Sequence, residues 1–226
     1  AEAWSYYLIK ASADLAEEQG ACLWSDQTKY HNGLTPNQTY KQDVDELVPH
    51  KERMDWRGLR DQLKSTGIRN STLMALMPAE TSAQISNATN GIEPPRSLVS
   101  VKQSKHGVLK QVVPSIHKLK NKYELLWDQR SPEGYLSIMA VLQKYIDQGI
   151  SVNTSYNPVF YEDEKISMSE MLRHLMIFYK YGGKQLYYFN TYDGQGELDV
   201  DKLTESTNIT VPEEDIIEED CESCVI

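Results

Sequence analysis

A short apolar run that ends at a proline limits most strongly how this chain can fold. Thr72–Met77 has the length of a β-strand and no charged residue, and Pro78 stops it. The residues that follow, Glu80, Thr81 and Ser82, have side chains typical of a helix start. The free N–H groups and the positive dipole of a helix start suit a phosphate. A plain helix cap explains the pattern as well, so both a structural cap and an anion site remain open here.

Helical periodicity on both sides of this run predicts an α/β fold that is rich in helices. The helices are expected at about residues 4–20, 55–64, 115–127, 134–148 and 167–182. We expect the apolar residues at helical spacing to face the core, among them the methionines of the last helix. A hairpin is expected from residues 98–101 and 108–113 and a strand from 185–189, while residues 25–50 and 153–165 read as loops.

Charge divides the chain into a neutral body and an acidic tail. The residues from Asp193 to Ile226 carry 12 acidic side chains and one basic side chain, Lys202, whereas residues 1–192 carry 21 acids and 22 bases. A segment with the composition of this tail buries too little apolar surface to offset the entropy of ordering. We therefore expect residues 1–192 to fold and residues 193–226 to form a disordered acidic tail.

The composition also excludes several classes of protein. A nucleic-acid-binding protein needs a basic face, and none stands out in the sequence. No apolar run approaches the ~20 residues that span a bilayer. The N-terminal sequence Ala1-Glu2-Ala3-Trp4 has no basic region followed by an apolar core, so no signal peptide is predicted. We expect a cytoplasmic protein with neither a nucleic acid nor a membrane as its partner.

Two pairs of reactive side chains lie toward the C-terminus. Tyr187 and Tyr188 are adjacent in a predicted strand, and the simplest explanation is two aromatics on opposite faces of a sheet. Adjacent phenols can also lose an electron and a proton together and pass a radical along. Cys221 and Cys224 form a Cys-x-x-Cys pair, which suits either half of a zinc site or a mobile dithiol. Because the chain has no second cysteine pair and its histidines are scattered, the sequence favours the dithiol and predicts no metal site.

Three stretches resemble one family. Pro78-Ala79-Glu80-Thr81-Ser82, continued by Gln84-Ile85-Ser86-Asn87-Ala88-Thr89-Asn90-Gly91-Ile92-Glu93-Pro94, closely resembles the substrate-diphosphate loop of the class I ribonucleotide reductase large (alpha) subunit. Leu186-Tyr187-Tyr188, followed by Asn190-Thr191, resembles its paired tyrosines. Cys221 and Cys224 resemble its terminal cysteines, although many relatives have a longer gap between the two.

This resemblance implies a fold and a set of roles. The fold would be the C-terminal part of a ten-stranded α/β barrel over residues 1–192, followed by a flexible tail, 193–226, that carries the dithiol. The implied activity is the reduction of ribonucleoside diphosphates to deoxyribonucleoside diphosphates by radical chemistry, for DNA synthesis. The residues implied to hold the substrate diphosphate are Pro78, Ala79, Glu80, Thr81 and Ser82. Tyr187 and Tyr188 would relay oxidising equivalents, and Cys221 and Cys224 would shuttle electrons from thioredoxin or glutaredoxin.

The resemblance also implies partners. The diiron-tyrosyl radical would reside in the beta subunit, and this chain would bind no cofactor itself. The radical-bearing cysteine and the allosteric nucleotide sites of the family lie upstream, and the setting of Cys22 does not match that cysteine. We therefore expect one half of a split alpha subunit, or a fragment of a longer chain, that needs the upstream portion to be active. The alternative is a non-catalytic interaction remnant of that subunit.

Overall fold

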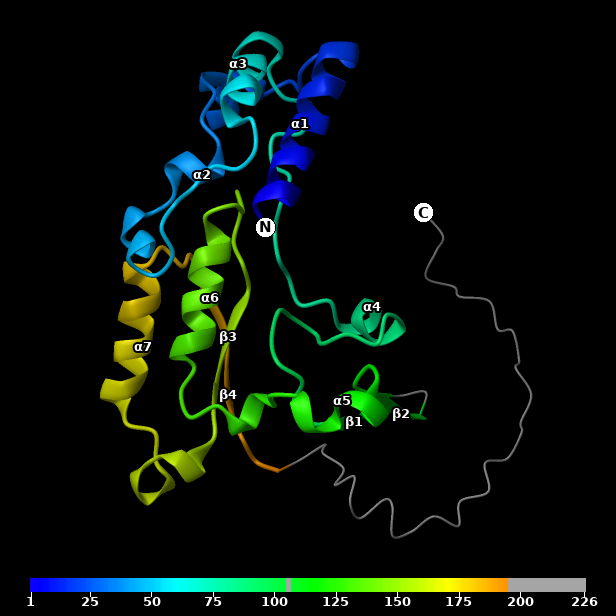
Figure 1. Ribbon diagram of the computed structural model, residues 1–226, viewed down its shortest axis with the longest axis vertical. Helices are drawn as coiled ribbons and strands as arrows, with labels where there is room; N and C mark the ends of the chain where they lie inside the picture. Colours follow the sequence, from blue (N-terminus) through cyan, green and yellow to red (C-terminus); the bar gives the residue numbers. More distant parts are fainter. Residues whose placement is uncertain (105–106, 195–226) are drawn as a thin grey trace, which may run out of the picture.

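The computed structural model describes residues 1–104 and 107–194, without the side chains of Glu80, Thr81, Gln84 and residues 102–109. Its α-helices are α1 (Glu2–Gln19), α2 (Pro36–Thr39), α3 (Trp56–Thr66), α4 (Glu80–Ile85), α5 (Ile116–Leu119), α6 (Glu133–Gln143) and α7 (Met168–Lys180). Its strands are β1 (Val99–Ser104), β2 (Gly107–Val112), β3 (Val152–Tyr156) and β4 (Leu186–Thr191). Short 3-10 turns are η1 (Ser25–Gln27), η2 (Lys29–Asn32), η3 (Gln42–Glu46), η4 (Lys120–Lys122), η5 (Leu126–Asp128), η6 (Pro158–Phe160) and η7 (Glu162–Glu164). In Figure 1, α1 and α3 lie together at one end, and α6 and α7 run alongside β3 and β4.

Three helices have the boundaries that their capping residues predict. α1 ends immediately before Gly20, as expected. α3 follows Asp55, whose carboxylate accepts a hydrogen bond from the backbone N–H of Gly58 at 3.0 Å. α7 follows Ser167, whose hydroxyl accepts one from the backbone N–H of Glu170 at 3.2 Å. These signals are local, because each cap satisfies a free N–H or C=O group of its own helix end.

The buried faces of α1 and α7 differ from those that the apolar spacing predicts. In α1 the buried residues are mostly small: Ser5, Ile9, Ser12, Ala13 and Ala16. In α7 the buried residues are His174 and Phe178, while Met168, Leu172, Leu175, Met176 and Tyr179 are exposed. The expectation that the methionines of this helix fill the core is therefore wrong. Small residues allow close approach between helices, so apolar spacing alone does not identify the side that packs.

Two other predicted helices are shorter than expected. The helix predicted over 134–148 ends at Gln143, and the one predicted over 115–127 is reduced to the single turn of α5 and two 3-10 turns. Ser115 has a left-handed backbone with φ of 54°, which interrupts any helix at its start. Because residues 115–127 lack a sustained apolar stripe, packing does not stabilise a longer helix there.

The described strands form two separate two-stranded sheets. β1 and β2 make the predicted antiparallel hairpin, whose predicted turn includes residues 105 and 106, outside the described residues. β3 pairs with β4 in parallel, and β4 confirms the strand predicted over residues 185–189. β3 itself occupies the start of a stretch that the sequence predicts as loop. Residues 1–104 and 107–194 do not form a closed barrel.

The predicted strand Thr72–Met77 is an extended segment with a single parallel bridge. Leu76 pairs with Ile150, and the backbone N–H of Ser151 donates to the Leu76 carbonyl at 2.8 Å. This segment therefore lies beside the chain that leads into β3, on its way to α4. The predicted order of extended segment, Pro78 and helix is confirmed, although the ladder is shorter than a regular strand.

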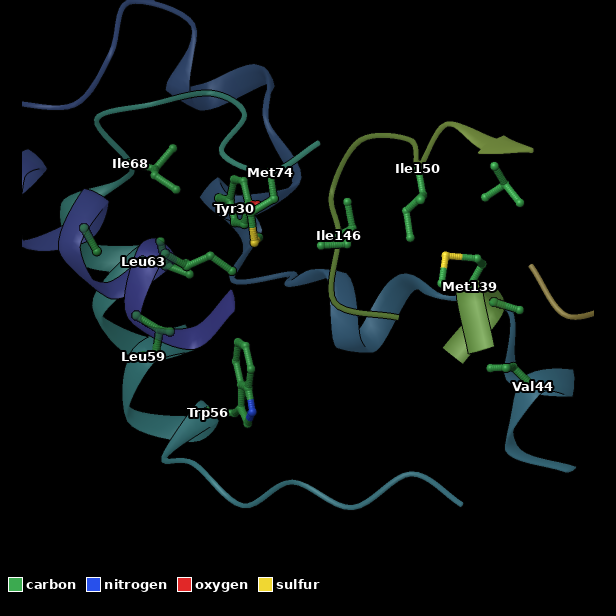
Figure 2. Close-up of a cluster of buried hydrophobic side chains, with 14 of the residues drawn as sticks. Tyr30, Val44, Trp56, Leu59, Leu63, Ile68, Met74, Met139, Ile146 and Ile150 are labelled. Carbon is green, nitrogen blue, oxygen red and sulfur yellow. The ribbon is translucent and has the colours of Figure 1, made fainter. Parts of the chain in front are cut away.

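One core joins the α1–α3 end to α6 and β3. Figure 2 shows Trp56, Leu59 and Leu63 of α3 on one side of a cluster, and Met139 of α6 and Ile150 on the other. A contiguous buried cluster of this kind is the main source of folding free energy. It fixes the segment around residue 74 between the two halves of the core, immediately before the residues predicted to bind substrate.

Asp147 ties this segment to the loop after α6. Its carboxylate accepts three hydrogen bonds: from the backbone N–H of Leu73 at 2.8 Å, from that of Met74 at 2.9 Å, and from the Tyr30 hydroxyl at 2.9 Å. Burial, reinforced by the nearby carboxylate, raises the pKa of Tyr30, so the phenol stays protonated and donates. This carboxylate therefore helps to fix the position of Met74, together with the surrounding core and the hydrogen bond from the Gln148 N–H to the Met74 carbonyl.

Candidate active site

Tyr187 and Tyr188 share a β-bulge in β4. The pairing register shifts between Val152 and Thr154 of β3, so that both tyrosines lie opposite Asn153. Their ring centroids are 4.2 Å apart, with 56° between the ring planes. In a regular strand, successive side chains face opposite sides of the sheet. The bulge overrides that rule and brings the two phenols into contact, with 50% and 58% of their residue surface exposed.

Asn153 links the tyrosine strand to the loop that follows α4. Its Oδ1 accepts a hydrogen bond from the backbone N–H of Tyr188 at 3.1 Å, and its Nδ2 donates to Glu93 Oε2 at 3.4 Å. Burial raises the pKa of the neighbouring Tyr135, and the charge of Glu93 raises it further. The sequence interpretation missed Asn153 because it places residues 153–165 in a loop. The alternation of Val152, Thr154 and Tyr156 is the signal that would have identified the strand.

The predicted substrate loop is closed by backbone hydrogen bonds. α4 begins at Glu80, as expected, and the N–H of Ala79 donates to the Asn90 carbonyl at 2.7 Å. Pro78 is partly buried, and Ala79 and Ser82 are exposed. The side chains of Glu80 and Thr81 lie outside the described part of the chain. The segment thus has the geometry of a short exposed turn of helix held at its base.

The hairpin β1–β2 supports the far side of this loop. Asn87 has a left-handed backbone with φ of 53°, and its side chain donates to the Val112 carbonyl at 2.7 Å. Gln111 of β2 donates to the Ala88 carbonyl at 2.7 Å. Within the described residues, the buried Oδ1 of Asn90 accepts no hydrogen bond. A buried acceptor without a donor is unusual, and it marks this loop as a place where a polar group could be received.

Both candidate regions are attached to residues 150–156, which comprise β3 and the residues just before it. The loop is anchored there at both ends, through the bridge of Leu76 to Ile150 and through Glu93 to Asn153. The same strand pairs with β4, which carries the tyrosines. The structure thus brings the rings of Tyr187 and Tyr188 into contact with each other. It connects them to the Pro78–Ser82 segment only indirectly, because both are attached to the segment that contains β3. Cys221 and Cys224 lie outside the described residues.

A buried polar network supports β3 from the side of α7. His174 is fully buried; its Nδ1 lies 2.9 Å from the Tyr156 hydroxyl and its Nε2 lies 3.1 Å from the Ser131 hydroxyl. Burial lowers the pKa of His174, the Arg173 charge lowers it further, and Glu170 opposes them. Burial raises the pKa of Tyr156 to about 12.

Tyr156 also connects this network to the tyrosine strand. Its ring stacks on Phe189 with centroids 4.7 Å apart, and Phe189 directly follows Tyr188 in β4. The sequence interpretation assigned no role to His174 or Tyr156. His174 lies beside Arg173 and outside the apolar spacing of this helix, so the sequence contains no signal that could have identified it.

Over residues 1–104 and 107–194, histidine, cysteine, aspartate and glutamate side chains do not gather in groups of three or more that could hold a metal ion. No described helix is long and apolar enough to cross a membrane.

Comparison with known proteins shows the family to which the chain belongs. Residues 1–189 match the family model described as "Ribonucleotide reductase, barrel domain". The chain belongs to this family.

The curated relatives of the chain are alpha subunits of ribonucleoside-diphosphate reductases. The chain is 54% identical over 193 residues to "Ribonucleoside-diphosphate reductase 1 subunit alpha" of Salmonella typhimurium, covering 85% of this chain and 25% of the relative. It is 49% identical over 225 residues to the reductase subunit alpha of Buchnera aphidicola subsp. Acyrthosiphon pisum, covering 100% of this chain and 28% of the relative. It is 41% identical over 221 residues to that of Enterobacteria phage T4, covering 97% and 28%. The chain therefore spans about a quarter of the length of the curated relatives it matches.

Proposed function

We propose that this chain forms the C-terminal portion of the catalytic subunit of a ribonucleoside-diphosphate reductase. The reaction would convert a ribonucleoside diphosphate and a dithiol into a deoxyribonucleoside diphosphate, a disulfide and water. The observation that carries the proposal is the bulge in β4, which puts the rings of Tyr187 and Tyr188 4.2 Å apart. A strand that served only to pack has no need of a register shift at two half-exposed phenols.

The loop around α4 is proposed to hold the substrate diphosphate. The backbone from Pro78 to Ser82 enters a helix, where free N–H groups favour an anion. The side chains of Glu80, Thr81 and Ser82 would complete the cradle, as the resemblance implies. Support comes from the exposure of Ala79 and Ser82 and from the anchoring of both loop ends on the β3 segment.

The tyrosine pair is proposed to relay the radical. Each transfer oxidises one phenol by one electron and one proton while reducing its neighbour, so ring contact between Tyr187 and Tyr188 supports direct exchange. The diiron-tyrosyl radical that starts the relay would belong to a beta subunit, and this chain would supply no cofactor of its own. The receiving cysteine would belong to the upstream portion of the alpha subunit.

The acidic tail, residues 193–226, is proposed to carry the reducing dithiol. Cys221 and Cys224 would pass two electrons and two protons to a disulfide at the active site and become a disulfide themselves. Thioredoxin or glutaredoxin would then reduce them. Residues 1–192 would form the late part of a ten-stranded barrel that the upstream portion completes, in the cytoplasm. The exposed apolar faces of α1 and α7 suit a chain that works inside a larger assembly.

The test compares two reductants in the protein assembled from this chain, the remaining part of an alpha subunit, and a beta subunit. Cys221→Ser should abolish turnover driven by thioredoxin or glutaredoxin, because the tail can no longer form a disulfide. It should retain turnover driven by a small dithiol that enters the site directly. Cys22→Ser is the matched control and should be active with both. Full turnover by the isolated 226-residue chain would overturn the proposal that the upstream portion is required.

A non-catalytic interaction remnant remains the second candidate. It would keep the family fold over residues 1–189 without the reaction. If this alternative holds, Tyr188→Phe should leave the binding of partners by the assembled protein unchanged. Neither the parent nor the variant should then turn over substrate.

A further inference from the structure

A cavity outside the proposed active site lies near the start of β4. It has a volume of about 610 Å³ and lies between the segments around η2 and η3, the end of α6 and residues 181–184. Its apolar walls include Leu34, Pro36, Val44, Ala140 and Ile146. None of the residues proposed for substrate binding or radical transfer lines it, so the cavity has no role in the proposed reaction.

The cavity is positively charged. Its lining includes four lysines, Lys29, Lys41, Lys144 and Lys184, and a single acid, Asp147. Asp45, which does not line it, neutralises Lys144 through an ion pair of 2.5 Å.

In the described part of the chain, the remaining lysines form no ion pair, although the charge of Asp147 acts on Lys184. Lys184 donates to the backbone carbonyls of residues 146, 147 and 148, and Lys41 donates to that of Tyr179. Carbonyls do not cancel the charge of a lysine. Among the described residues, the ammonium group of Lys29 has neither a hydrogen-bond nor an ion-pair partner. An apolar cavity bordered by excess positive charge suits a ligand that is apolar at its centre and acidic at its ends.

The chain itself contains such a segment. Residues 213–220 read Glu-Glu-Asp-Ile-Ile-Glu-Glu-Asp, with Ile216 and Ile217 between three acids on each side. They belong to the tail that carries most of the net negative charge of the protein, whereas residues 1–192 are nearly neutral. Residues 213–220 therefore match the cavity in two ways: their isoleucines suit its apolar walls, and their acidic side chains suit its lysines.

The tail is long enough to reach the cavity. Lys184 lines the cavity, and the described chain ends at Gly194. To reach the cavity, the tail must run back along β4 from Gly194 to Lys184, which is roughly 35 Å at ~3.3–3.6 Å per residue. The residues from Gly194 to Ile216 span up to about 75 Å when extended. Tethering raises the effective concentration to the order of millimolar, so a segment with weak intrinsic affinity would still occupy its site.

We propose that residues 213–220 dock in this cavity, with Ile216 and Ile217 inside and the flanking acids beside Lys29, Lys41 and Lys184. Cys221 follows the docked segment directly and would be held at the surface. If the proposed reductase function holds, this docked state presents the dithiol to its external reductant between visits to the active site. The docking itself does not depend on that function.

The test is zero-length cross-linking of the full 226-residue chain with a carbodiimide, which joins lysine amines to carboxylates, followed by peptide mapping. Cross-links from residues 213–220 should go to Lys29 and Lys41 at least fivefold more often than to the exposed lysines Lys118 and Lys165. Ile216→Ser with Ile217→Ser should lower this yield at least threefold, and 0.5 M salt should lower it as well. Ile209→Ser, in the same tail but outside the segment, should leave it unchanged.

Two outcomes would overturn the proposal. One is cross-linking spread evenly over Lys29, Lys118 and Lys165. The other is an unchanged yield in the double serine variant, which would leave only non-specific attraction between an acidic tail and lysines. Neither outcome would bear on the proposed reductase function, because turnover is not the readout.

Discussion

Asp147→Ala should destabilise the protein more than most single substitutions. The change leaves three donors without an acceptor: the backbone N–H groups of Leu73 and Met74 and the Tyr30 hydroxyl. Each unsatisfied buried donor costs about 1–3 kcal/mol. Met74 and Tyr30 are buried and Leu73 is partly exposed, so the expected total is about 3–5 kcal/mol. That is a large share of a typical folding free energy of ~5–15 kcal/mol.

The assay is thermal unfolding followed by circular dichroism. For a chain of this size each kcal/mol shifts the midpoint by roughly 2–4 °C, so Asp147→Ala should lower it by about 6–20 °C. Tyr30→Phe removes only one of the three donors and should cost about 1 kcal/mol. Asp61→Ala is the matched control, because Asp61 pairs with Lys64 on the exposed side of α3 at 3.4 Å and exposed pairs contribute at most ~1 kcal/mol. If Asp147→Ala melts within about 2 °C of this control, the reasoning about a shared carboxylate is refuted.

Three further substitutions test other parts of the account. Burial lowers the pKa of His174 in the folded protein, whereas the same histidine has its ordinary pKa near 6.5 in the unfolded chain. As the pH falls below about 6.5, the unfolded chain therefore binds a proton before the folded protein does, and the free energy of unfolding should decline toward the lower folded pKa. Above about pH 6.5 this contribution to stability should be fully present. His174→Gln should remove this decline in denaturant midpoints measured between about pH 7.5 and 5, whereas His117→Gln should keep it. Asp45→Ala leaves the ammonium of Lys144, which is 2% exposed, with only the Val48 carbonyl, and should cost about 2–4 kcal/mol in urea unfolding; an equal loss with Glu46→Ala, from the exposed pair with Lys180, would argue against a buried ion pair. Asn153→Ala removes the acceptor of the Tyr188 N–H and should cost about 1–3 kcal/mol while altering the near-ultraviolet dichroism of the two neighbouring tyrosines, whose rings are in contact; an unchanged spectrum would mean that the bulge does not need this side chain.

The starts of α3 and α7 were predictable because capping is local. Asp55 and Ser167 each satisfy a backbone group within three residues, so the sequence around them contains the information. The buried faces were not predictable in the same way. Ala13 of α1 and His174 of α7 are buried because of the elements that pack on them, and the spacing of apolar residues along one helix does not contain those partners.

The candidate site likewise has parts that the sequence predicts and parts that depend on how the strands pair. The Pro78–Ser82 segment and the tyrosine pair were found from the residues themselves and from a family resemblance. The contact between Tyr187 and Tyr188 depends on a register shift against Asn153, a property of the strand pair that the period of a single strand does not encode. Asn153 escaped notice because its strand lies in a stretch rich in asparagine and tyrosine that reads as loop.

The central claim is that the bulge in β4 holds two phenols in contact so that a radical can pass through them. The most direct measurement is deoxyribonucleotide formation by the assembled reductase carrying Tyr187→Phe or Tyr188→Phe, each of which removes one hydroxyl and keeps the ring. If this claim is correct, either variant should lose turnover by at least ~100-fold, about 2.7 kcal/mol in barrier, while its thermal midpoint stays within about 2 °C of the parent. Turnover equal to that of the parent in both variants would contradict it.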